Sequence, residues 1–135
     1  MSKAINLITL SEAVNVSFRN EKEREFLTAL YSYVSEWTQF GLTDDDSYVS
    51  LYDDSILMVA FDICDRKQSK ILRSLRVDFT GTSVLICDLG ARSSNLFDSQ
   101  LNVNDSDVKE YRVIGDSPSD LADLAAQWLT QEFSR

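Results

Sequence analysis

Short apolar runs alternate with small polar breaks between Ser47 and Leu89, and successive antiparallel strands leave this pattern in a sequence. The pattern predicts four strands, over residues 48–52, 56–64, 71–79 and 83–89. A short fifth strand over 110–114 is left open. The second strand is apolar on both faces, so we expect it in the middle of a sheet that is covered on both sides.

The third strand alternates between an apolar face and a polar face. Strict alternation places Ile71 on the same face as Arg73, and Arg76 and Asp78 on the opposite face. A polar connection precedes this strand, and Thr80-Gly81-Thr82 predicts a tight hairpin turn after it.

Helical patterns flank the strands. Apolar residues at spacings of three and four predict a helix over about 20–39, with Gly41 as its left-handed C-cap. A second helix over about 118–133 begins at Ser117-Pro118, a capping serine followed by proline in the first turn. Residues 4–18 fit either a strand or a helix. The sequence therefore predicts one α+β domain over residues 1–135, with an antiparallel sheet of about four to five strands packed against two helices.

The charge balance narrows the possible partners. The 135 residues include 13 Lys and Arg against 22 Asp and Glu, for a formal net charge of -9. Direct binding of nucleic acid needs a cationic face, so this balance argues against it. It favours a cationic partner, with plain solubility as the alternative.

The residue types exclude several chemistries. There is no His, so His-activated nucleophiles and imidazole metal ligands are excluded. No glycine-rich phosphate loop occurs, and Cys64 and Cys87 lie in separate apolar runs, where we expect buried, reduced thiols. Asp44–Asp46 lacks the spacing of a calcium loop, because Val49 and Ser55 stand where Gly and Glu are needed. We expect no cofactor, no metal and no enzymatic activity.

The N-terminus and the apolar runs point to a compartment. The first residues carry one Lys and no long apolar core, and no apolar run is long enough to span a membrane. We therefore expect a cytoplasmic protein that does not contact a membrane.

One acidic stretch is a candidate binding site. Seven acids and no basic residue lie between Asp44 and Asp65, and a hairpin would return Asp62 and Asp65 towards Asp44–Asp46. Such a cluster steers a cationic partner, and interleaved tyrosines suit a protein interface. In the alternative interpretation, the basic residues of 66–76 neutralise the cluster within the fold. The predicted partner-binding residues are Asp44, Asp45, Asp46, Tyr48, Asp53, Asp54, Asp62 and Asp65.

The end of the chain carries a resemblance. The run Tyr111-Arg112-Val113-Ile114, then Ser117-Pro118, then the segment from Leu121 to Leu129, resembles the ending of many small immunity proteins of bacterial toxin systems, including contact-dependent growth inhibition. The resemblance implies an inhibitor that binds the catalytic domain of one cognate toxin. Many such toxins are nucleases with basic clefts, which an acidic face complements.

Other functions stay open at this level. An acidic mimic of nucleic acid would inhibit several DNA-binding proteins, whereas an immunity protein protects against one toxin. A small enzyme using carboxylates or a bound metal is a further alternative. The chain could also be a subunit of a larger assembly or form a homodimer, because the second apolar face of the sheet needs cover.

Overall fold

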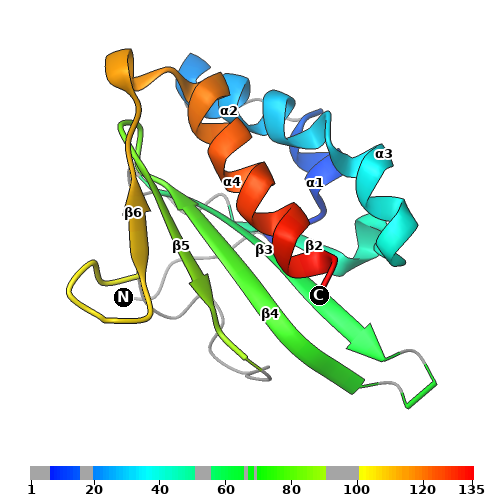
Figure 1. Cartoon of the computed structure of the whole chain (residues 1–135). Helices are drawn as coiled ribbons and strands as arrows, with labels where there is room; N and C mark the ends of the chain where they lie inside the picture. Colours follow the sequence, from blue (N-terminus) through cyan, green and yellow to red (C-terminus); the bar gives the residue numbers. More distant parts are fainter. Residues whose placement is uncertain (1–6, 16–19, 51–55, 66, 69, 91–100) are drawn as a thin grey trace, which may run out of the picture.

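The computed structural model describes residues 7–15, 20–50, 56–65, 67–68, 70–90 and 101–135. Six antiparallel strands form one sheet in which each strand pairs with its neighbours in the sequence (Figure 1). The strands are β1 (Leu7–Ile8), β2 (Ser47–Ser50), β3 (Leu57–Asp65), β4 (Lys70–Phe79), β5 (Val84–Asp88) and β6 (Lys109–Tyr111). The α+β prediction and the antiparallel meander are confirmed.

The four predicted strands match β2 to β5 closely. The short strand considered over 110–114 is present as β6, which begins one residue earlier and is shorter. The undecided N-terminal stretch contains both kinds of structure in its described part. It forms the two-residue strand β1 and the short helix α1 (Leu10–Ala13). A capping box between Thr9 and Glu12 starts this helix.

The predicted N-terminal helix over 20–39 is divided in the structure. Helix α2 (Glu21–Tyr31) ends at a turn, after which α3 (Val34–Trp37) and the 3-10 turn η1 (Thr38–Phe40) follow. The Tyr33 hydroxyl donates to Asp123 and the Trp37 indole N–H donates to Thr130, each at 2.8 Å. These contacts with the C-terminal helix favour the break over a continuous helix. Gly41, at a φ of 85°, ends η1 as predicted.

The C-terminal helix α4 (Pro118–Phe133) has the predicted bounds, and the Ser117 hydroxyl caps it by accepting from the Asp120 N–H. Two more 3-10 turns complete the described elements, η2 (Asp44–Asp46) before β2 and η3 (Ile114–Asp116) before α4.

The main core lies between the sheet and the helices α2, α3 and α4, which cover one of its faces (Figure 1). The rings of Phe26 and Phe79 stack at 4.5 Å between centroids. Trp37 packs edge-on against Phe61 and Phe133, at 5.4 and 5.2 Å. Aromatic packing therefore joins α2 and α3 to the sheet, and α3 to α4.

The opposite face of the sheet is also buried. Met58 and Ala60 of β3 are almost inaccessible, and Val108 covers Leu85 and Cys87 of β5. No helix among the described residues contributes to these two clusters. The prediction that β3 is a central strand covered on both sides is confirmed.

A β-bulge alters the far end of β4. Ile63 pairs with Arg73 but Cys64 pairs with Ile71, so Leu72 is an extra residue on β4. Because neighbouring residues of β3 point to opposite faces, Ile71 lies on the face opposite Arg73. The prediction that Ile71 shares a face with Arg73 was wrong, since strict alternation does not allow for a bulge.

A search of the described helices finds none with the length and apolar character needed to cross a membrane.

Candidate functional site

Six of the eight predicted binding residues are described, and they lie towards one end of β2 and β3. Ser47 pairs with Phe61, and β3 continues from there to Asp65. Asp62 and Asp65 therefore return to the end of the sheet where Asp44–Asp46 precede β2, as the hairpin predicted. Asp53 and Asp54 lie outside the described residues.

Two of the three acids in η2 hold the local fold. Asp44 accepts hydrogen bonds from the backbone N–H and the hydroxyl of Ser11, which fixes η2 against α1. Burial raises the pKa of Asp44, but the hydrogen bonds from Ser11 outweigh burial and leave the pKa below its usual value. Asp46 is only 6% exposed and accepts from the Thr43 N–H at 2.8 Å in a capping box. Asp45 is the member of the triplet that is exposed to solvent.

Tyr48 and Asp62 lie on the sheet face opposite the helices. Asp62 is 6% exposed and accepts from the Ser74 hydroxyl at 2.7 Å. Burial, followed by the charge of Asp62 and a hydrogen bond to it, raises the pKa of Tyr48 to about 12. These two residues form a polar contact within the sheet, and their side chains are largely withdrawn from solvent.

Asp65 has a local role at the turn between β3 and β4. Its carboxylate accepts from the backbone N–H groups of Lys67 and Gln68, at 3.0 and 3.3 Å. This contact is typical of an Asx turn, in which a side chain replaces a backbone acceptor. Asp65 is half-buried.

An apolar crevice opens where α1, α3 and η2 meet. Its apolar walls come from Leu10 of α1, Val34 and Trp37 of α3, Leu42, and Phe61 of β3. Thr43, Asp44 and Ser47 add polar groups to the same crevice. Because the three elements that meet here also carry exposed acids, apolar and acidic groups combine at this end of the molecule.

We define the acidic surface as the exposed carboxylates of these three elements: Glu12 on α1, Glu36 on α3 and Asp45 on η2. Sequence analysis singled out Asp45 but missed Glu12 and Glu36. A longer window would have found Glu36, because the whole stretch from residue 25 to residue 65 contains nine acids and no Lys or Arg.

Two basic residues of the 66–76 segment, Arg76 and Arg73, make ion pairs elsewhere. The guanidinium of Arg76 binds Asp78 through two contacts of 2.8 and 2.9 Å, and the two side chains are 3% and 0% exposed. Burial raises the pKa of Asp78 above its usual value. The hydrogen bonds from Arg76 and from the Leu101 N–H offset only part of this rise. This buried pair joins the sheet to the segment that begins at Leu101.

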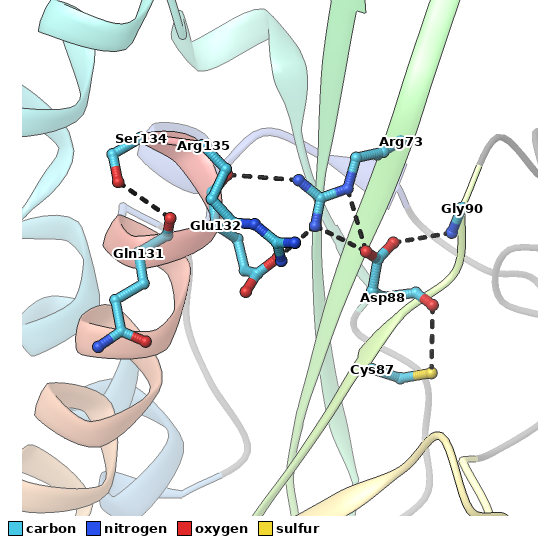
Figure 2. Close-up of polar contacts among 8 residues, drawn as sticks. All are labelled: Arg73, Cys87, Asp88, Gly90, Gln131, Glu132, Ser134 and Arg135. Carbon is cyan, nitrogen blue, oxygen red and sulfur yellow. Dashed lines mark hydrogen bonds and ion pairs between the residues drawn. The ribbon is translucent and has the colours of Figure 1, made fainter.

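Arg73 makes the second group of ion pairs, at the C-terminal end of α4 (Figure 2). Its guanidinium lies between Asp88 of β5 and Glu132 of α4 and bonds to both carboxylates. Arg135 also binds Glu132, at 2.9 Å, and Asp88 accepts from the Gly90 N–H. The contacts of Arg73 tie α4 to two strands.

Within the described ranges, no group of three or more His, Cys, Asp or Glu side chains is placed to hold a metal ion.

No family model, curated protein or solved structure matches the chain.

Proposed function

We propose that this chain is an immunity protein that acts in the bacterial cytoplasm, where it binds the cationic catalytic domain of a cognate toxin and neutralises it. One observation carries the proposal. Three elements that line an apolar crevice each carry an exposed carboxylate, and two of these carboxylates, Glu36 and Asp45, lie in the stretch 25–65 that has no Lys or Arg. The resemblance of the chain's ending to immunity proteins supports the same function.

The acidic surface suits a partner with a basic cleft. Carboxylates at Glu12, Glu36 and Asp45 give this face a negative potential that speeds the approach of a cation. The crevice beside them has apolar walls but room for only about one water molecule, so a partner would pack against its mouth without inserting a side chain. Charges at the rim with an apolar centre are the usual arrangement of a specific protein interface.

The predicted site residues then take different roles. Asp45 contacts the partner, whereas Asp44 and Asp46 hold η2 in place through Ser11 and Thr43. Tyr48 and Asp62 support the sheet beneath the surface, and the proposal gives them no direct contact with the partner.

The test begins with the gene immediately upstream, which we expect to encode a large secreted protein with a variable C-terminal domain. That domain should stop growth when expressed in cells, and co-expression of this chain should restore growth. Charge reversal by Glu36→Lys with Asp45→Lys should lower the association rate constant about tenfold and weaken its salt dependence.

A matched control is Glu21→Lys, which reverses a highly exposed charge on α2 away from the crevice. It should leave the association rate nearly unchanged. An unchanged association rate in the double variant would contradict the proposed surface. Inhibition of several unrelated DNA-binding proteins would instead support the nucleic-acid mimic.

A further inference from the structure

The hairpin end of β3 and β4 extends beyond the helices. We define the hairpin end as residues 63–65, 67–68 and 70–72. The two strands continue past the C-terminal end of α4 (Figure 1). Burial falls along both strands in the same direction: the last three residues of β3 are half-buried, and Lys70 and Leu72 of β4 are exposed.

Apolar groups of the hairpin end meet solvent. Leu72, the extra residue of the bulge, is 43% exposed, and its neighbour Ile71 is half-buried, whereas Ile63 lies on the other face and packs against the main core. Exposed apolar groups that are close together, with charged groups around them, often mark an interaction surface.

A run of basic residues begins directly after Asp65, in the turn of the hairpin end. Four of the chain's thirteen basic residues lie between residues 66 and 73 with no acid among them, which leaves nine bases against 22 acids in the rest of the chain. Of these four, Lys67 and Lys70 are exposed. The exposed acid Asp45 lies at the same end of the molecule, because η2 contacts β3 and leads into its neighbour β2.

We infer that this end of the molecule is the interface of a symmetric homodimer. The hairpin end of each copy lies antiparallel to that of the other, so that Lys67 and Lys70 face Asp45 of the second copy. A two-fold interface uses the same patch on both subunits, so the patch must contain both halves of every contact. This end of the molecule does so, with a basic part, an acidic part and apolar side chains.

The spacing along the strands fits this arrangement. Ser47 is level with Phe61, and β3 continues four residues further to Asp65, or roughly 13 Å at the rise of an extended strand, before the turn that carries Lys67. The middle of the segment from Phe61 to Lys67 is Cys64, which pairs with Ile71 of β4, and Leu72 is the next residue of β4. A two-fold axis there places apolar side chains at the centre of the interface and the Lys–Asp contacts at either side.

The chain alone is enough to test the inference by sedimentation equilibrium. At about 0.15 M salt the Debye length is near 8 Å, so the repulsion between two acidic molecules is screened while direct contacts persist. The wild-type chain should dimerise. The variants Lys67→Glu/Lys70→Glu and Asp45→Lys should each raise the dimer dissociation constant at least tenfold, which is about 1.4 kcal/mol.

Mixing the two variants gives the sharpest outcome. In a mixed dimer, the Glu side chains of one variant face Lys at position 45 of the other, and the second contact keeps its natural charges. The mixture should therefore dimerise more tightly than either variant alone. A mixture no tighter than its components would overturn the reciprocal geometry, and a wild-type chain that stays monomeric at millimolar concentration would overturn the dimer itself.

A second pair of variants tests the apolar centre. Leu72→Asp should weaken the dimer at least tenfold, whereas Ile114→Asp, at a fully exposed apolar residue outside the hairpin end, should leave it unchanged. Equal effects of the two variants would contradict the placement at the hairpin end. None of these measurements involves a toxin, so their failure is separate from any failure of the proposed function.

Discussion

At the residue scale, the ionisation of Tyr48 reports on the sheet beneath the acidic surface. Burial and Asp62 raise its pKa to about 12 from an ordinary value of 10.0. The phenolate absorbance of Tyr48, identified by its loss in Tyr48→Phe, should therefore appear after that of an exposed tyrosine. In Asp62→Asn the neighbouring charge is removed, and the Tyr48 pKa should fall towards 10.

The same shift makes stability depend on alkaline pH. A folded pKa above the unfolded one means that the folded chain holds its proton while the unfolded chain releases it. The contribution of Tyr48 is thus complete below about pH 10 and is lost as the pH rises to about 12. Urea unfolding across this range should show a smaller loss in Tyr48→Phe than in wild type. An equal loss would mean that Tyr48 is not the group responsible.

Single residues also mark the limit of sequence analysis. The run Asp44–Asp46 looked like three equivalent acids, but the structure gives each a different environment. The hydrogen bonds of Asp44 come from Ser11, 33 residues earlier in the chain, and no local pattern predicts such a partner. Asp46, by contrast, accepts a hydrogen bond from the N–H of Thr43, three residues earlier, and so caps its own turn. This spacing is that of a capping box and can be recognised in the sequence.

At the element scale, long periodic segments were predictable and short ones were not. The strands β3 and β4 and the helix α4 carry clear periods, and their bounds agree with prediction to within one residue. By contrast, β1 has two residues and α1 has four, which is too short for a period to appear. The periodic pattern runs unchanged across the break between α2 and α3, and Tyr33 and Trp37 after the break contact α4, which lies about 90 residues further along the chain.

The C-terminal end of α4 offers a test of how elements are joined. Arg73 links Glu132 of α4 to Asp88 of β5, so Arg73→Met should lower the free energy of unfolding by about 1–2 kcal/mol. Amide hydrogen exchange should also quicken over the last turn of α4, because its anchor to the sheet is lost.

The matched control for this test is Arg135→Met. Arg135 binds the same Glu132, but its side chain is 68% exposed, and exposed pairs contribute about 0–1 kcal/mol. A larger loss of stability in Arg135→Met than in Arg73→Met would contradict the role assigned to Arg73.

At the scale of the whole molecule, the two proposed interactions share Asp45. The acidic surface uses it for a cationic partner, and the proposed dimer places it against Lys67 and Lys70 of a second copy. A toxin domain that binds the acidic surface would therefore compete with dimer formation, so a complex with the toxin should contain one copy of this chain.

The net charge of -9 favours binding of a cationic partner but lowers the stability of the fold. Like charges on one compact molecule repel each other, and the acidic surface adds to this repulsion. The stretch from residue 25 to residue 65 contains no Lys or Arg that could offset it. The variant Glu36→Lys with Asp45→Lys reduces the net charge to -5, because each reversal adds two charges. At low salt it should unfold at higher urea, with a gain of up to about 1 kcal/mol.

Salt distinguishes this explanation from a local effect of the two lysines. Added salt screens the repulsion, so the stability difference between the variant and wild type should shrink towards zero at about 1 M salt. The association rate with the toxin domain should fall in the same variant, because the charges that repel one another also attract the partner. Lower stability of the variant at low salt would mean that Glu36 and Asp45 stabilise the fold. That result would contradict the claim that these acids serve binding at a cost in stability.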